Sequence, residues 1–156
     1  MKTTYKILII CVFGILMFGI GFLVADFVNA PPIPVTDNPL ISSDRAKTTV
    51  GAFMSARIQR NQLKAEEFLT DNAKEQYSQP GLTLIGTSNP HFAGFDIGRT
   101  EKLDSTQFKF NVRIYEEYTG QGRVGHFDET LIVIKSGDKY LIDSVERGEY
   151  VNYEQE

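Results

Sequence analysis

Few side chains in this sequence have both the type and the spacing for acid–base chemistry. The best pair is His126 and Asp128, because residues two apart on a strand point to the same face of a sheet. Imidazole and carboxylate groups are common general bases, so this pair is the candidate catalytic site of the sequence. The competing interpretation makes His126 a solvated residue beside a glycine loop and Asp128-Glu129 an exposed charge at a sheet edge. A catalytic role therefore requires that the His126 ring face a cavity.

The remaining side chains give no support for metal, thiol or serine chemistry. A metal site needs three or more convergent ligands, whereas the two histidines, His91 and His126, are 35 residues apart in the chain. The single cysteine, Cys11, lies in an apolar amino-terminal stretch, so the rest of the chain has neither a thiol nucleophile nor an internal disulfide. No G-x-S-x-G motif is present. We therefore predict no metal site and no cofactor.

Three glycines have the spacing of a dinucleotide-binding loop. Gly120, Gly122 and Gly125 match G-x-G-x-x-G, but that motif acts only where the glycines leave a strand and open a helix. Here one strand pattern ends near Tyr118 and another begins near Val124. The glycines are therefore predicted to supply positive φ angles in a hairpin loop, without binding a nucleotide.

Three helices of decreasing length are predicted to precede the strands. Ser42-Ser43-Asp44 offers capping side chains for a helix over residues 44–61, in which Lys47, Arg57 and Arg60 flank an apolar stripe. The stripe recurs at three- and four-residue steps: Ala46, Val50, Phe53, Met54 and Ile58. A short second helix is expected near residues 63–69. Thr70-Asp71 caps a third, which ends at Pro80-Gly81.

After Gly81 the apolar pattern changes to a period of two. Strands are expected at residues 82–85, 93–103, 108–114, 131–134 and 140–146, with a hairpin turn at Ser136-Gly137-Asp138. Five aromatic residues are predicted to lie in the core: Phe92, Phe95, Phe108, Phe110 and Phe127. Helices followed by an antiparallel meander predict an α+β fold.

The amino-terminal stretch predicts a membrane anchor. Residues 7–24 are eighteen residues without a charged or strongly polar side chain, which just reaches the length needed to cross a bilayer. Lys2 and Lys6 precede this run, and basic residues normally stay in the cytoplasm, so the rest of the chain is expected outside. The alternative is a signal cleaved after Ala30, which would give a secreted product, although two prolines follow that position directly. We expect an uncleaved, single-pass anchor in the cell membrane.

The sequence divides into four expected segments. These are a transmembrane anchor in residues 1–28, a proline-rich linker in 29–42, one folded domain in 43–148 and an acidic tail in 149–156. The chain carries 16 basic and 20 acidic side chains, a net charge of −4. This charge argues against nucleic acid or anionic lipid headgroups as partners.

Residues 52–77 (AFMSARIQRNQLKAEEFLTDNAKEQY) read as a helix, a polar turn and a short helix with a Leu-Thr cap, and residues 138–148 (DKYLIDSVERG) read as a closing strand. These stretches resemble the nuclear transport factor two-like superfamily, including its members among bacterial exported proteins. The resemblance spans residues 43–148 and implies a cone, in which three helices fold over the concave side of a curved antiparallel sheet. The mouth of the cone is an enzyme site in some members and a filled core in others, so the fold alone does not choose a function.

These observations lead to one main functional hypothesis and two alternatives. The main hypothesis is a membrane-anchored, extracytoplasmic, non-catalytic accessory domain that binds an exported protein partner or a small apolar ligand. A ligand is expected to contact Phe53, Tyr77, Phe95 and Tyr115 if the helices leave space above the sheet. The alternatives are a small isomerase- or hydrolase-like enzyme with His126 as its base, and a structural subunit that forms homodimers.

Overall fold

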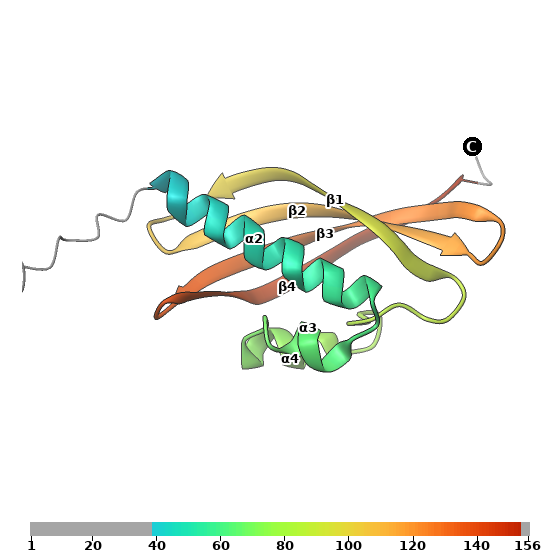
Figure 1. The fold of residues 1–156 in the computed structure, drawn as a ribbon, viewed down its shortest axis with the longest axis horizontal. Coiled ribbons are helices and arrows are strands. Elements are labelled where there is room, and N and C mark those ends of the chain that lie inside the picture. The colour runs from blue at the N-terminus through green and yellow to red at the C-terminus, as the bar shows by residue number, and fades with distance from the viewer. Residues whose placement is uncertain (1–38, 154–156) are drawn as a thin grey trace, which may run out of the picture. The chain divides into compact units, whose positions relative to one another are not determined.

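The computed structural model describes residues 39–153, and residues 42–153 with their side chains. Its elements, in chain order, are the helices α2 (Pro39–Ile58), α3 (Gln62–Glu66) and α4 (Asp71–Tyr77) and the strands β1 (His91–Lys102), β2 (Gln107–Tyr118), β3 (Gly122–Ser136) and β4 (Lys139–Asn152). Helices come first and an antiparallel sheet follows, which confirms the predicted α+β class (Figure 1).

Part of the expected organisation lies outside these residues. The predicted anchor at residues 7–24, most of the proline-rich linker and the last three residues of the tail are not among those that the structure describes. Among residues 39–153, no helix is both long and apolar enough to span a membrane.

Helix α2 lies across one face of the sheet and contacts β1, β2 and β4 (Figure 1). Four residues of the predicted apolar stripe are buried, namely Ala46, Val50, Phe53 and Met54, and the fifth, Ile58, is partly buried. Arg57 is also buried and extends the stripe by one turn. The helix begins at Pro39, so the prediction that Ser42-Ser43-Asp44 cap it is wrong. Proline suits the first position of a helix, because the N–H that it lacks would have no helical partner there and its φ is already helical.

The two short helices connect α2 to the edge of the sheet at β4. Thr70 caps α4 as predicted, because its hydroxyl oxygen accepts a hydrogen bond from the Ala73 N–H at 3.3 Å. The backbone just before α4 also pairs with β4: Ile142 N–H donates to the Phe68 carbonyl at 2.8 Å, and Thr70 N–H donates to the Ile142 carbonyl at 2.9 Å. These bonds hold α4, and with it Tyr77, against the sheet.

The four strands form one antiparallel sheet in the order β1-β2-β3-β4, so each strand pairs with its neighbour in the chain. The strands are longer than predicted, and β4 continues to Asn152, past the expected end of the domain at residue 148. The strand predicted at residues 82–85 is wrong, because this segment joins no ladder. The carbonyl groups of Thr83 and Leu84 instead accept hydrogen bonds from arginine side chains.

The glycine loop is a hairpin, as predicted. Tyr118 pairs with Gly122 across the β2–β3 turn, and Gly120 and Gly122 have φ angles of 84° and 85°, which other residues rarely adopt. A strand follows this loop, so the glycines lack the helix N-terminus that a pyrophosphate needs. The predicted turn between β3 and β4 is also present, with Gly137 at a φ of 60°.

We call the sheet face that packs against the helices the inner face and the opposite one the outer face. The inner face supplies most of the core: Phe108, Phe110, Val112, Ile114, Phe127, Leu131, Val133 and Ile142. The predicted aromatic core is confirmed, because four of its five members are at most 4% exposed and Phe95 is partly buried against them. Residues that alternate with these, including His126 and Asp128, lie on the outer face.

Candidate functional site

A cluster of charged side chains lies buried between the helices and the sheet. Arg57 of α2, Tyr77 of α4, Glu129 of β3 and Arg147 of β4 make up this cluster, which we call the buried ion cluster. Arg57 and Glu129 are fully buried and form a two-pronged pair, with Nη1 to Oε2 at 2.6 Å and Nη2 to Oε1 at 3.1 Å. Arg147 Nη2 and Nε donate to Oε1 at 2.6 and 3.0 Å, and the Tyr77 hydroxyl donates to Oε2 at 3.3 Å. Both carboxylate oxygens of Glu129 are therefore occupied.

The guanidinium group of Arg57 fills the space beneath α2. Its Nε donates to the Leu84 carbonyl at 2.7 Å, and its Nη2 donates to the Thr83 carbonyl at 3.2 Å. Three aromatic rings surround it, those of Phe53, Tyr77 and Phe92, with their centroids 5.1 to 5.4 Å from the guanidinium carbon. A planar group with five donors can satisfy a carboxylate and two carbonyls at once, which an ammonium group cannot do in the same geometry.

The electrostatics of the cluster keep Glu129 charged. Burial alone would raise the pKa of Glu129, but the charges and hydrogen bonds of Arg57 and Arg147 outweigh burial and hold that pKa below its ordinary value. Burial raises the pKa of Tyr77, so its hydroxyl stays protonated and donates. A general base needs a free lone pair and a pKa near the working pH, and Glu129 has neither. The arrangement links α2 and α4 to β3 and β4.

Three of the four residues predicted to contact a ligand belong to the core or pack against it. Phe53 and Tyr77 lie in the core with ring centroids 6.2 Å apart, and Phe95 packs against the same core. Tyr115 lies on the outer face, where its hydroxyl donates to the Asp96 carboxylate at 2.7 Å. The rings of Phe53 and Tyr77 both contact the Arg57 guanidinium group of the chain itself.

His126 is packed between two tyrosine rings on the outer face. The ring centroids of Tyr115 and Tyr153 are 6.2 and 5.5 Å from that of His126. Its Nδ1 atom is buried and has no hydrogen-bond partner among the described residues. A histidine that acts as a general base is usually oriented by a hydrogen bond to a third group, which the sequence predicts to be a carboxylate. These tilted ring contacts support a structural role for the His126 ring.

Asp128 shares the outer face with His126, as predicted, but it pairs with a different residue. Its carboxylate accepts two hydrogen bonds from Arg113, at 2.8 and 3.1 Å, and about half of each side chain is exposed. These bonds hold the pKa of Asp128 below its usual range. An open depression of about 260 Å³ lies beside this pair, and His126 is not among its lining residues. Arg113 is therefore the hydrogen-bond partner of Asp128, and His126 adds only a weaker electrostatic effect on the Asp128 carboxylate.

A second depression lies where α2 approaches the β3–β4 hairpin. This groove has a volume of about 650 Å³ and is open to solvent; its lining residues are Arg45, Thr48, Thr49, Glu67, Phe68, Asp138, Lys139, Tyr140 and Leu141. None of the residues predicted for catalysis or ligand binding lines it. Within residues 39–153, no group of three or more His, Cys, Asp and Glu side chains could hold a metal ion.

The sequence contained a signal for Glu129 that its interpretation as an exposed edge charge missed. Glu129 alternates with Phe127 and Leu131, and both of these lie on the inner face. Arg57 follows Phe53 by four residues, which places it on the buried stripe of α2 rather than on its flank. Both patterns place a charged residue in the core, and a buried charge requires a partner.

Comparisons with known proteins add no relative of this chain. No protein-family model, no curated protein and no solved structure matches it. The resemblance to the nuclear transport factor two-like superfamily stays a prediction from the sequence pattern.

Proposed function

We propose that this chain is a membrane-anchored accessory domain outside the cytoplasm, which binds a protein partner through its surface and catalyses no reaction. The observation that carries this proposal is the buried ion cluster. An enzyme or ligand carrier of the expected fold would use the space between the helices and the sheet. In this chain the Arg57 guanidinium and its partners occupy that space, so recognition is assigned to the surface.

The proposed fold is a cone of the nuclear transport factor two-like type. What supports it is the order of three helices before a four-stranded antiparallel meander, together with the packing of α2 against the inner face (Figure 1). In this proposal, side chains of the chain itself fill the interior of the cone. The charged cluster then acts as an internal clamp, which ties α2 and α4 to β3 and β4.

The enzyme alternative has less support than the accessory role. Its base, His126, lies against the tilted rings of Tyr115 and Tyr153, and the nearest predicted acid, Asp128, is held by Arg113. A catalytic histidine would require an acid or substrate group within hydrogen-bond distance. Among the described residues, the Nδ1 atom of His126 has no such partner.

The proposed location rests on residues 7–24. An apolar run of this length is expected to insert with a gain of about 4 to 8 kcal/mol from its leucine, isoleucine, valine and phenylalanine side chains, before its glycines are counted. Lys2 and Lys6 favour a cytoplasmic amino terminus. The proline-rich residues that follow would then hold the domain away from the bilayer surface.

The location is tested by expressing the full chain in bacterial cells and measuring its distribution and mass. We expect the intact chain, beginning at Met1, in the membrane fraction after alkaline carbonate washing. Replacing both Ile15 and Leu16 by arginine is expected to move it to the soluble fraction, since each arginine costs about 2.5 to 3.5 kcal/mol at the centre of a bilayer. Leu63→Arg is the matched control, because Leu63 is 79% exposed and the change leaves the anchor intact. A soluble wild-type product that begins at Pro31 would contradict the anchor.

A further inference from the structure

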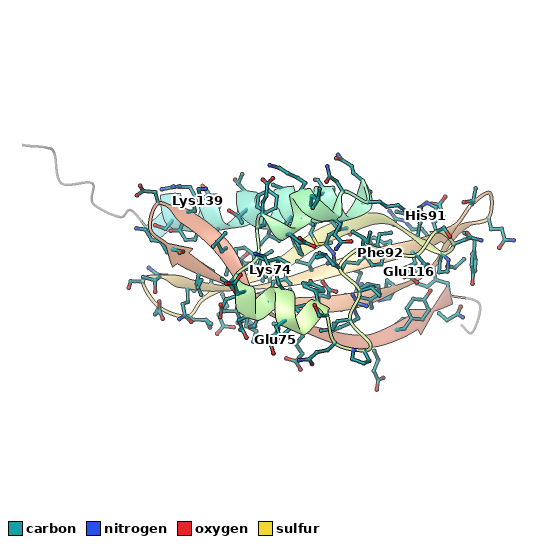
Figure 2. The ribbon with its side chains drawn as sticks, turned by 90° about the horizontal axis from the view of Figure 1, so that it is seen from below. Lys74, Glu75, His91, Phe92, Glu116 and Lys139 are labelled. Carbon is teal, nitrogen blue, oxygen red and sulfur yellow. The ribbon has the colours of Figure 1, made fainter. Side chains whose placement is uncertain are left out.

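Glu116 lies in a small pocket at the end of the inner face that is nearer the β2–β3 hairpin. It is the register partner of Phe92 on β1 and of Gly125 on β3. Along β3, Phe127 separates Gly125 from Glu129 of the buried ion cluster. Figure 2 shows Glu116 beside Phe92 and away from Lys74 and Glu75 of α4. The pocket has a volume of about 240 Å³, and its lining residues are Pro90, Glu116, Tyr118, Val124, Tyr150 and Asn152.

Gly125 provides the room for the Tyr150 side chain, which lines this pocket. A Cβ atom at Gly125 would lie 2.3 Å from the Tyr150 hydroxyl oxygen and 2.4 Å from the Val151 carbonyl oxygen, so any larger residue would displace Tyr150 and strain the backbone. The Tyr150 ring therefore passes over Gly125, and its hydroxyl donates a hydrogen bond to the Glu116 carboxylate. This contact holds the carboxylate within the pocket, while Tyr150 remains 46% exposed.

The carboxylate of Glu116 lacks the counter-ion that Glu129 has. Among the described residues, the salt bridges do not include Glu116. Arg147 acts on Glu116 through its charge, while its guanidinium group hydrogen-bonds Glu129 and the Thr83 carbonyl. Burial raises the pKa of Glu116, and this effect outweighs the opposing effects of the Tyr150 hydroxyl and of Arg147. A partly buried carboxylate without a salt-bridge partner is stabilised by a cation from outside.

The walls of the pocket select the kind of cation. Tyr118 and Tyr150 present aromatic rings, which attract cations over their faces, and Pro90 and Val124 present apolar surface. One carboxylate is too few oxygen ligands for a metal ion, whereas a cation that carries an alkyl chain matches both the charge and the apolar walls. The volume lies below the range of about 300–1,000 Å³ that is usual for drug-sized ligands, so the pocket suits the end of one side chain or a small amine.

We propose that the Glu116 pocket binds an organic cation, an alkylammonium or guanidinium group of the size found at the end of a lysine or arginine side chain. The carboxylate pairs with the charged group, and the two tyrosine rings and Val124 contact its alkyl chain. The site does not depend on the anchoring of the chain or on the absence of catalysis, so this proposal and the proposed function can be tested independently.

The test is a titration of the full chain in nonionic detergent micelles, followed by the amide NMR signals of Val124, Gly125 and Tyr150. n-Butylammonium is expected to shift these signals saturably, and n-butanol, which lacks the charge, is not. Glu116→Gln is expected to weaken the binding of n-butylammonium about tenfold, because the charge is lost while the shape is kept. Glu117→Gln is the matched control, since it makes the same change one residue along β2, outside the pocket lining, and should bind within about twofold of the wild type.

A second ligand separates the two sources of such a cation. If lysine capped at both ends as an amide binds at least as tightly as n-butylammonium, the pocket accepts a side chain of a protein. If only n-butylammonium binds, the ligand is a free amine. Equal shifts by n-butanol and n-butylammonium would overturn the proposal, as would no saturable shift with either amine, or equal binding by Glu116→Gln and the wild type. The comparison of n-butanol with n-butylammonium uses the wild-type chain, so the test holds even if Glu116→Gln fails to fold.

Discussion

Glu129→Ala is expected to lower the free energy of unfolding by about 3–5 kcal/mol. The substitution removes the carboxylate that pairs with Arg57 at 2.6 Å and leaves a guanidinium group with no exposed surface and no counter-ion. Arg147 and the Tyr77 hydroxyl also lose their acceptor. The measurement is urea denaturation of the full chain in nonionic detergent, followed by tyrosine fluorescence.

The neighbouring residue provides the control for this prediction. Asp128 also accepts two hydrogen bonds from an arginine, but its pair with Arg113 lies on the outer face and is about half exposed. Asp128→Ala is therefore expected to cost less than about 1 kcal/mol. Similar losses for the two variants would mean that water reaches the Arg57–Glu129 pair, and the interior would then be open rather than filled.

Arg57→Lys is expected to lower the free energy of unfolding by about 2–3 kcal/mol, although it keeps the positive charge. The guanidinium group of Arg57 reaches Glu129 and the carbonyls of Thr83 and Leu84 together. A lysine ammonium can pair with the carboxylate but leaves the Leu84 carbonyl without its donor in a buried place. We also expect faster amide hydrogen exchange in residues 82–90, because the Arg57 side chain links this segment, which forms no strand, to α2.

Arg113→Lys is the matched substitution on the outer face. Its partner Asp128 is half exposed, and water can replace the second hydrogen bond there. The expected loss is below about 1 kcal/mol, without a change in hydrogen exchange at residues 82–90. If Arg57→Lys lowered the free energy of unfolding by no more than Arg113→Lys does, the fork geometry of Arg57 would not contribute to the stability of the fold.

The elements that local patterns determine were predictable from the sequence. The apolar stripe of α2, the Thr70 cap of α4 and the two glycine-containing hairpins depend on residues within a few positions of one another. The antiparallel meander follows from short connections between alternating strands, because such strands pair with their neighbours in the chain. The start of α2 was less predictable, since Pro39 and the Ser42-Ser43-Asp44 cluster are both good signals for a helix N-terminus.

The buried ion cluster depends on contacts between residues far apart in the chain. Arg57 and Glu129 are separated by 72 positions. The sequence pattern around either residue does not indicate that the other is its partner. Alternation along β3 could have placed Glu129 on the inner face, but only the order of the strands and the position of α2 bring an arginine to it. The segment at residues 82–85 shows the same limit, because its leucines fit a strand while its carbonyls are used by Arg57 and Arg147.

Two acidic residues of the inner face, Glu129 and Glu116, have different roles in this account. Glu129 has its charge balanced inside the protein by two arginines, so it stabilises the fold. Glu116 lines a pocket at the end of the inner face and has no salt bridge among the described residues, so in our proposal it is available to a partner. This division is what the accessory role requires, since a closed interior leaves recognition to exposed groups.

A double-mutant cycle between Arg57 and Glu129 tests most directly whether the chain fills its own interior. The free energy of unfolding is measured for Arg57→Met, for Glu129→Gln and for the double variant, with the cycle of Arg113→Met and Asp128→Asn as the reference. We expect a coupling energy of about 2–3 kcal/mol for the buried pair and below about 1 kcal/mol for the exposed pair. Additive effects at Arg57 and Glu129 would contradict the buried clamp, and with it the argument that this domain acts through its surface.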